Sequence, residues 1–533
     1  MAVYDSAYAS VVATVVRGSS WHSQLAWLTP PSERERDLYL GRRQHRWFFW
    51  AQAVALVGVA VSLYGLARNA YWTTAFLLPL AAFVAEQVLA LRTSTYPRRI
   101  DLRTHRRVVD GWAPTVVPSV DVFIPTCGED PALIDNTAYH ASKLRWAGRL
   151  TVYLLDDADD PAVERIARRY GFRYLTRVGS AYKKAGNLQR ALERSSGDLI
   201  TILDADFAPR TDYLLELVPY LDDPRIGIVQ SPQLFFTDRT MSWLERCAGA
   251  TQEMFYRFIQ PSRDAVGAAI CVGTSAVYRR SALRAIGGFP QIGHSEDIYT
   301  GIEMGKAGFG LRYVATCVSR GRCPDRLDAF LTQQYRWCEG SLSLLADTGF
   351  HLDPSMTRPQ RASFWSGFAY YLITAVNALL APMASLVMLW FFPAQVSNWN
   401  MLPLVAAVLL WLVVYPMLAA GRWRVEVLRV QAVYGFAHLF CLLDLIRGRS
   451  LEWRPTNAAG GRGGGMARIR LVMGAYLMVT QGLIGAGLAL AVSRYGFGEF
   501  WALIPLTALN AYVFLPVVWL AIRQTPAARG AVA

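Results

Sequence analysis

The chain has 533 residues, of which 53% are hydrophobic and only 18% are charged. This composition excludes an ordinary soluble protein, and the length allows two or three domains. The formal net charge of +14 would fit a nucleic-acid partner if the basic residues formed one surface. Instead, the arginines crowd beside apolar runs: Arg34, Arg36, Arg42, Arg43 and Arg46 before the first run, and Arg92, Arg98 and Arg99 after the second. Arginine in such places is typical of the cytoplasmic flanks of membrane helices, so we expect a lipid bilayer and no nucleic acid as partner.

The N-terminal segment, residues 1–46, is expected to be cytoplasmic or to lie along the membrane surface. It carries Asp5 and lacks a basic start, which argues against a cleavable signal peptide. The seven cysteines of the chain show no paired metal-ligand spacing and are expected to be reduced thiols.

Six segments have the length of about 20 apolar residues that crosses a bilayer. They form three pairs: 47–67 and 71–91 (region 47–91), 372–393 and 401–420 (region 372–420), and 469–492 and 499–521 (region 469–521). The links within each pair contain few basic residues, whereas residues 92–371 and 421–468 are rich in arginine. The positive-inside rule therefore places both of these regions, and both termini with the tail 522–533, in the cytoplasm.

Two regions are expected at the inner membrane surface. The apolar stretch 425–446 is interrupted at helical spacing by Glu426, Arg429, His438 and Asp444, which predicts an amphipathic helix. A glycine-rich stretch follows in region 421–468; without a preceding strand it predicts a flexible loop and no phosphate-binding loop. Residues 331–371 predict further interface helices.

Residues 92–330 have the pattern of a soluble α/β domain. Strands are predicted at 120–125, 150–155, 199–203 and 226–230, and helices at 130–144, 161–170 and 184–195. This alternation predicts parallel strands with crossover helices, that is, a doubly wound α/β sheet. Ligands of such sheets bind at the carboxyl ends of the strands, which is where the acidic motifs lie.

Asp204 and Asp206 follow a buried strand at a spacing of two residues. Two such carboxylates can share one divalent cation, Mg2+ or Mn2+, and a nucleotide-sugar needs that cation to neutralise its departing diphosphate. An Asp-x-Asp pair is common by chance, and its place at the end of a strand is what favours a metal site.

A second acidic group, residues 156–160, ends the preceding strand. Asp156 or Asp157 lies near enough to the strand end to reach a nucleotide or a metal. Asp159 and Asp160 fit a solvated turn, in which Asp159 is expected to cap the next helix.

Three later motifs allow both a structural and a functional interpretation. Residues 183–187 are either an ordinary basic helix start or a site for an anion. Ser295-Glu296-Asp297 either caps a helix or supplies the general base that a sugar hydroxyl needs. Residues 333–337 either anchor a helix at the membrane surface or offer a tryptophan face to a sugar and an arginine to phosphate.

Taken in order, these motifs resemble the family-2 glycosyltransferases, and specifically the catalytic subunit of bacterial cellulose synthase. The strand VDVFIPTCGEDP, the run Lys184-Ala185-Gly186-Asn187-Leu188, the pair Asp204/Asp206, the stretches 253–256 and 273–280, Ser295-Glu296-Asp297 and Gln333-x-x-Arg336-Trp337 carry the resemblance. It spans roughly residues 45–521 and implies a GT-A-type domain inserted among membrane helices.

The resemblance implies a role for each matching residue. Asp297 is the implied catalytic base, and Asp204 and Asp206 hold the metal. The implied contacts of the UDP-sugar are Thr126, Glu129, Asp157, Lys184, Asp204, Gln333, Arg336 and Trp337. The implied contacts of the growing polysaccharide are Tyr256, Gly273, Thr274, Ser275, Glu296 and Trp337. Trp453 and Thr456 fall in the implied gating loop.

Several features depart from the family pattern. Ser295 replaces the usual threonine, Val272-Gly273-Thr274 stands where Cys-Gly-Ser is usual, and the gating loop lacks its lysine. No PilZ domain that would bind cyclic-di-GMP is expected in this chain. The resemblance favours a processive enzyme that makes a β-linked polysaccharide, from UDP-glucose or a related donor, in a bacterial inner membrane. A transferase acting on a lipid and a non-catalytic nucleotide-binding sensor or transporter remain alternatives. A periplasmic or export subunit is a further candidate partner.

Overall fold

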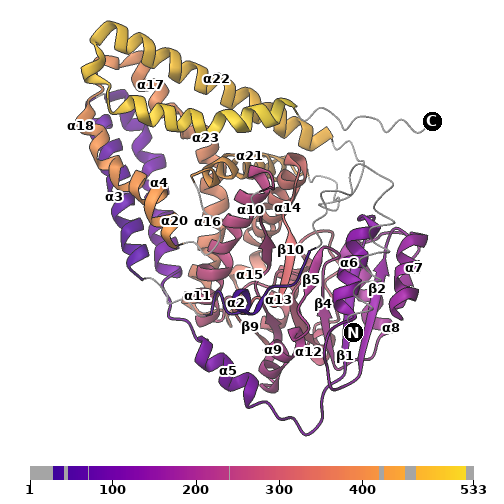
Figure 1. Ribbon diagram of the computed structural model, residues 1–533. Helices are drawn as coiled ribbons and strands as arrows, with labels where there is room; N and C mark the ends of the chain where they lie inside the picture. Colours follow the sequence, from indigo (N-terminus) through magenta and orange to yellow (C-terminus); the bar gives the residue numbers. More distant parts are fainter. Residues whose placement is uncertain are drawn as a thin grey trace, which may run out of the picture.

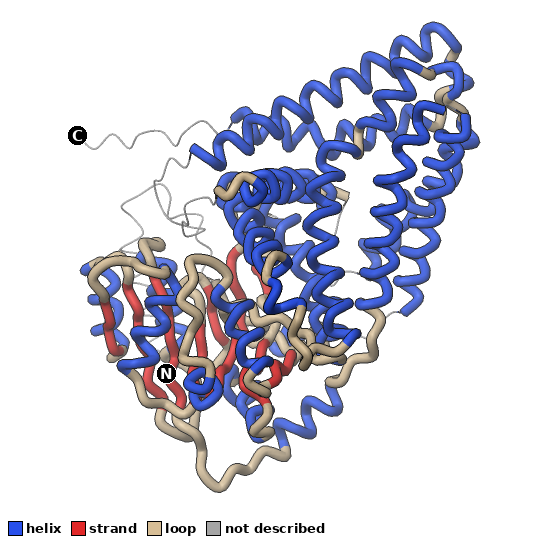
Figure 2. The backbone as a smooth tube through the Cα atoms, turned by 180° about the vertical axis from the view of Figure 1, so that it is seen from behind, coloured by secondary structure: helices blue, strands red, loops and turns tan. Residues whose placement is uncertain are grey.

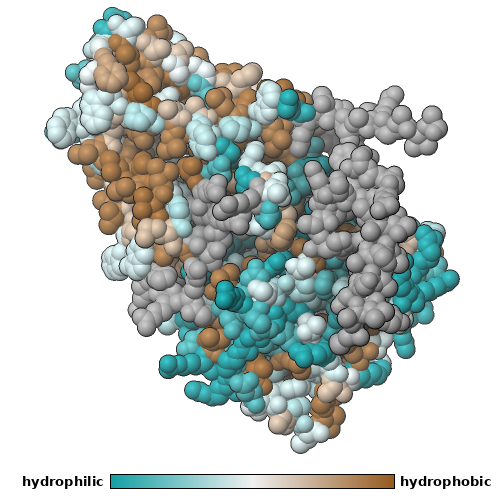
Figure 3. Space-filling view, in the orientation of Figure 1, coloured by the Kyte–Doolittle hydropathy of each residue, from teal (hydrophilic) through white to brown (hydrophobic). Residues whose placement is uncertain are grey.

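The structure is a computed structural model that describes residues 28–40, 46–69, 71–238, 240–418, 425–449 and 464–523. It has two parts: an α/β domain and a group of long helices beside it (Figures 1 and 2). On the face shown in Figure 3, hydrophobic side chains gather over the long helices, while the α/β domain is largely hydrophilic. The division predicted from hydropathy is thus visible on the molecular surface.

The α/β domain is built on a seven-stranded sheet with the strand order β3-β2-β1-β4-β8-β6-β9. The strands are β1 Val120–Thr126, β2 Leu150–Asp156, β3 Arg173–Thr176, β4 Leu199–Ile202, β6 Ile226–Gln230, β8 Ala276–Arg279 and β9 Gly310–Tyr313. The four predicted strands are β1, β2, β4 and β6, and β1, β2 and β4 pair in parallel. The four predicted strands all run in the same direction, because β4 and β6 are both antiparallel to β8, a strand that the sequence did not predict. A strand of four residues is too short for its sequence to reveal its direction.

The helices of the domain begin close to where the sequence predicts them. α6 Pro131–Ala141, α7 Pro161–Tyr170 and α8 Lys183–Arg194 connect the parallel strands. Asp160, and not Asp159, caps α7 by accepting a hydrogen bond from the backbone N–H of Ala162. Further helical segments are α9 Tyr213–Leu217, η4 Val218–Asp222, α12 Arg280–Ala285 and α13 Glu296–Lys306.

A second sheet of three short strands lies beside the first. It contains β5 Phe207–Pro209, β10 Ser319–Arg322 and β7 Leu234–Phe236, in the order β5-β10-β7. The segments α10 Trp243–Met254, η5 Phe255–Ile259, α11 Gln260–Ala265, α14 Leu327–Leu345 and α15 Thr348–His351 then lead toward the long helices.

Seven helices of the described residues are long and apolar enough to cross a membrane. They comprise α3 Arg46–Asn69, α4 Leu77–Thr93 after η3 Tyr71–Phe76, α16 Arg358–Leu380 with α17 Met383–Phe391, the segments from α18 to α20 (Asn398–Leu418), α21 Val427–Ile446, α22 Gly464–Tyr495 and α23 Leu503–Arg523. Six correspond to the predicted spans, and α16 begins at Arg358, well before the predicted residue 372.

The seventh helix, α21, is the stretch for which the sequence predicts an interface position. Its hydropathy of 1.3 is the lowest of the seven, and half of its most apolar window is buried inside the protein. Arg429 and His438 are among its buried residues. Length and composition alone therefore do not separate a span from a surface helix at α21, and the interface position stays a prediction.

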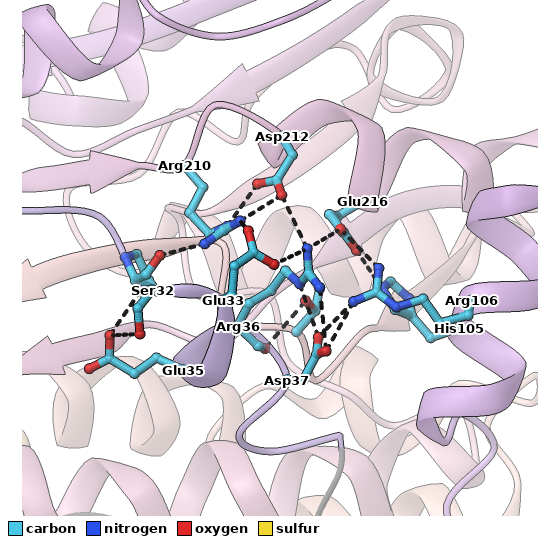
Figure 4. A network of polar contacts seen from close by, with 12 residues as sticks. Ser32, Glu33, Glu35, Arg36, Asp37, His105, Arg106, Arg210, Asp212 and Glu216 are labelled. Carbon is cyan, nitrogen blue, oxygen red and sulfur yellow. Dashed lines mark hydrogen bonds and ion pairs between the residues drawn. The ribbon is translucent and has the colours of Figure 1, made fainter.

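The N-terminal segment 28–40 is fastened to the α/β domain by ion pairs (Figure 4). Arg36, on α2 Glu33–Arg36, contacts the carboxylates of Asp212 and Glu216 at 3.4 Å each. His105, on α5 Leu102–Asp110, is fully buried and lies 2.6 Å from Glu216. Arg36, which precedes the first long helix, is thus also an ion-pair partner of the α/β domain.

The network predicts a stability difference between two arginines of the same helix. Arg36→Gln should lower the free energy of unfolding by roughly 2 kcal/mol, because it removes a cation shared by the partly buried carboxylates of Asp212 and Glu216. Arg34 is exposed, so Arg34→Gln, which changes the net charge equally, should have little effect. Thermal unfolding of the detergent-solubilised protein checks this: Tm should fall by roughly 2 °C for Arg36→Gln. Equal Tm values for the two variants would contradict the network's role.

Candidate functional site

A polar cleft of about 200 Å3 opens at the carboxyl ends of β1, β2 and β4. Eleven of the predicted site residues line it together: Thr126, Glu129, Asp157, Lys184, Asp204, Asp206, Glu296, Asp297, Gln333, Arg336 and Trp337. The cleft also contains residues that the sequence did not single out, among them Phe207, Gln233, Phe235 and Arg322. Side chains separated by more than 200 positions in the chain are thus brought to one sheet edge, as expected for this kind of fold.

Asp156 and Asp157 have different roles at the end of β2. Asp156 is fully buried and accepts hydrogen bonds from the backbone N–H groups of Ala158 and Asp160, at 2.9 and 2.7 Å, and from the Tyr174 hydroxyl. These bonds hold the turn that follows the strand. Asp157 lies at the cleft and forms a two-bond pair with Arg177, both bonds at 2.7 Å. Of the two, only Asp157 is placed to meet a ligand.

Carboxylates crowd together at the end of β4. Burial, with the charges of Asp204 and Glu129, raises the pKa of Asp206 to about 7. Lys184 partly offsets this charge, because its Nζ donates to Asp204 Oδ1 at 2.6 Å and to the Gly273 carbonyl at 3.0 Å. Buried acids that raise one another's pKa in this way form a fitting environment for a divalent cation.

The described residues contain no group of three or more side chains arranged to hold a metal by themselves. Mg2+ is commonly bound through one or two carboxylates, with substrate phosphates and water completing its coordination. Asp204 and Asp206 therefore fit a cation that arrives with, or is completed by, a diphosphate.

Asp297 lies in the first turn of α13 and lines the cleft. Burial and the neighbouring Glu296 raise its pKa to about 7, and Lys184 opposes this shift. Gly273 has φ +73°, and a side chain there would come within 2.9 Å of Asp297 Oδ2. Gly273 is thus explained by the close approach of Asp297 to the chain. An acid with a pKa near neutrality is suited to accept a proton.

α14 presents Gln333, Arg336 and Trp337 to the cleft from one helical face. The motif thus lies at the cleft, as the ligand-binding interpretation requires. One turn further on, Gly340 packs against the Ser-Glu-Asp turn: a Cβ at Gly340 would lie only 1.8 Å from Ser295 Oγ. The small residue allows α14 and α13 to approach, which sets Trp337 and Asp297 in the same cleft.

Four of the predicted acceptor residues do not line the cleft. Tyr256 is buried in the domain core, and its backbone carbonyl accepts from the Tyr313 hydroxyl. Thr274 and Ser275 are fully buried; Thr274 Oγ1 accepts from the backbone N–H of Asp204 at 2.9 Å. Gly273 reaches the cleft only through its carbonyl contact with Lys184. Thr274 and the Gly273 carbonyl thus support the surroundings of Asp204, a role that sequence position alone could not distinguish from ligand contact.

The predicted gating-loop residues and the lining residues that were not predicted remain to be placed. Trp453 and Thr456, the implied gating loop, lie outside the described residues. Phe207, Phe235 and Arg322 come from the three strands of the small sheet. These strands are three or four residues long, too short for periodicity to mark them.

The cleft lies in a mixed α/β sheet of GT-A-like fold, beside helices that are long and apolar enough to cross a membrane. Residues 199–423 match the family described as glycosyl transferase family group 2. The predicted fold class and the resemblance to family-2 glycosyltransferases of the cellulose synthase kind are confirmed.

Known relatives include three bacterial proteins named cellulose synthase catalytic subunit [UDP-forming]. That of Xanthomonas axonopodis pv. citri is 32% identical over 42% of this chain and 31% of its own length. That of Komagataeibacter sucrofermentans is 31% identical over 52% of this chain and 37% of its own. That of Pseudomonas fluorescens is 29% identical over 55% and 40%. The chain therefore spans well under half the length of the relatives it matches.

Among solved structures, mannosyltransferase PcManGT from Pyrobaculum calidifontis, in complex with GDP-Man and Mn2+, is 18% identical with a TM-score of 0.47. That similarity covers 74% of this chain and 99% of the mannosyltransferase.

The contact between α14 and α13 predicts the effect of adding one methyl group. Gly340→Ala should lower Tm, because overpacking a close contact costs roughly 1–3 kcal/mol. Gly305→Ala is the control: Gly305 lies on α13, and a methyl group added there would meet no atom within 4 Å. Alanine also favours a helix, so the control should leave Tm unchanged or slightly raised.

The same contact predicts a rescue. Ser295 has φ +53°, a conformation that glycine adopts readily, so Ser295→Gly removes the clashing side chain without straining the turn. The double variant Gly340→Ala/Ser295→Gly should recover part of the lost Tm in thermal unfolding. Additive effects of the two substitutions would show that the contact is unimportant.

Proposed function

We propose that this protein is a processive, inverting glycosyltransferase that polymerises a β-linked polysaccharide from a UDP-sugar and exports it across a bacterial inner membrane. The observation that carries the proposal is the juxtaposition in one cleft of Asp297, the Asp204/Asp206 pair and Trp337. These supply a proton acceptor, a place for a diphosphate with its cation, and an aromatic face for a sugar. Because bacterial relatives carry the name UDP-forming, a UDP-sugar is the donor to test, and UDP-glucose is the first candidate.

In the proposed mechanism, Asp297 accepts the proton of the acceptor hydroxyl. The oxygen attacks the anomeric carbon from the side opposite to UDP, so that an α-linked donor gives a β-linked product. Gln333 and Arg336 orient the diphosphate and the acceptor, and Trp337 stacks on the terminal sugar. A divalent cation held by Asp204 and Asp206 would neutralise the charge of the leaving diphosphate.

A cavity among the long helices supports export by the same chain. Its volume is about 690 Å3, and α3, α4, α16, α21, α22 and α23 contribute to its lining. Carboxamides and aromatic rings occur along it, including Gln52, Asn377, Gln431, Gln481, Asn510, Tyr370, Trp411 and Tyr434. A sugar chain offers both hydroxyl groups and apolar ring faces, and such a lining can contact both.

The test is UDP release by the detergent-purified protein with a panel of UDP-sugars, with Mg2+, with Mn2+ and with EDTA. The proposal expects turnover with one donor, loss of turnover in EDTA, and a long polymer when the product is sized and digested with linkage-specific enzymes. Short glycolipids would instead indicate a transferase that acts on lipid. UDP binding without any turnover would indicate a sensor or transporter.

Within this assay, Asp297→Asn should lower the rate of transfer by roughly 100-fold or more, because the acceptor hydroxyl loses its base. The affinity for UDP should stay within a small factor of the wild-type value, since asparagine keeps the size of the side chain. Turnover and UDP binding are measured on the same preparation. A fully active Asp297→Asn variant would remove Asp297 from the mechanism.

The rate should also depend on pH. Asp297 acts as a base only when deprotonated, and its pKa is raised to about 7, so kcat/KM should rise with pH up to about 7 and then level. Protonation of Asp206, whose pKa is also about 7, would weaken binding of the metal and of UDP in the same range. UDP affinity is therefore measured at each pH to separate the two effects. A profile that is flat from about one unit below this pKa to one unit above it would contradict the assignment.

A further inference from the structure

Arg322 lines the cleft without a place in the proposed mechanism. It is the last residue of β10, in the small sheet, and its side chain is partly exposed toward the cleft. The motifs of the resemblance do not include this position. A guanidinium in a cleft is a ready partner for a phosphate group, because its planar fork matches two phosphate oxygens.

The strand register places Arg322 beside the metal-binding pair. β10 and β5 are antiparallel, with Gly321 opposite Phe207. One step further along the same register sets Arg322 across from Asp206, the second acid of the Asp-x-Asp pair. The Phe207 ring packs directly on the backbone of Gly321, so that a Cβ there would meet the ring at a forbidden distance. This packing fixes the end of β10 against the strand that follows Asp206.

A neighbouring arginine shows what a structural role would look like. Arg320, two residues earlier on β10, is buried, forms an ion pair with Glu35 of the N-terminal segment and lies over the Phe236 ring at 5.8 Å. For Arg322, no hydrogen bond or ion pair to another side chain is observed in the part of the chain that the structure describes. Its charge is thus not used in holding the fold.

The other two cationic side chains that line the cleft are Lys184 and Arg336, and they differ from Arg322 in their place in the fold or in their hydrogen-bond partners. Lys184 is bound to Asp204 and to the Gly273 carbonyl. Arg336 comes from α14, which lies outside both sheets. Of the three cations that line the cleft, Arg322 is the one on the small sheet, directly after the residue that packs on Phe207.

We propose that Arg322 binds the diphosphate of the nucleotide-sugar from the small-sheet side of the cleft, across from Asp206. The proposal rests on the proposed function, because it presupposes a nucleoside diphosphate donor. It adds a second arginine to the diphosphate site, carried by a strand of the small sheet rather than by α14. A charge-assisted pair of this kind stabilises bound phosphate but makes no contact with the nucleoside.

The test is a comparison of UDP, UMP and uridine binding to wild-type and Arg322→Gln protein in detergent, by calorimetry, with Mn2+ and with EDTA. The expected result is that Arg322→Gln weakens UDP binding by roughly tenfold or more, consistent with loss of a charged hydrogen bond. UMP should be affected less, and uridine not at all, which also shows that the variant is folded. Arg322→Lys should recover part of the UDP affinity, because it keeps the charge and loses the fork.

The control is Arg225→Gln, which removes an equal charge from a side chain that is 83% exposed and paired with Asp223. Equal UDP affinity in Arg322→Gln and wild type would overturn the proposal for Arg322 and leave the proposed function standing. Equal weakening of UDP and uridine would also overturn it, since that pattern indicates a distorted site. Failure of the wild type to bind UDP under any condition would overturn both.

Discussion

The close packing of acids in the cleft depends on the positive charge of Lys184. Glu129, Asp204, Asp206, Glu296 and Asp297 converge where three strands end, and burial makes their mutual repulsion costly. The ammonium group bridges Asp204 and the Gly273 carbonyl, and so ties together the start of α8, the end of β4 and the loop before β8. The nearby acids correspondingly raise the pKa of Lys184. One positive charge thus allows acids with pKa values near neutrality to share a single edge of the sheet.

Much of this arrangement could be predicted from the sequence because the signals are local. β1, β2, β4 and β6 are continuous apolar runs, and the acids that follow β2 and β4 fall at the carboxyl edge in any doubly wound sheet. Strand position thus predicts the place of Asp204 and Asp206, and the resemblance adds Asp297 to the same site. The motif on α14 could be placed by its spacing, since residues three and four apart share a helical face.

The remainder depends on contacts that leave no local trace. The antiparallel direction of β8 is set by the path of the chain between β6 and β8. The short strands β5, β7 and β10 are defined by their pairing with one another. Arg322 could not be found without their register. The acidic partner Asp212 of Arg36 lies more than 170 positions away, so the sequence around Arg36 does not reveal this contact. Thr274 matches a family motif equally well whether it faces a ligand or holds the backbone of Asp204, and only its burial and its hydrogen bond separate the two roles.

The close contact at Gly340 has a mechanical consequence. α14 packs on α21 as well as on α13, and the Tyr335 hydroxyl donates to Asp444 near the end of α21. A helix that packs on α13 with no room for a methyl group, and on a long helix at its other side, is held in place, because close-packed interfaces resist sliding. Under the proposed function, Trp337 then keeps its position, and the sugar chain moves forward by one unit along it after each bond is made. Processive synthesis would then rest on movement of the polymer relative to a stationary α14.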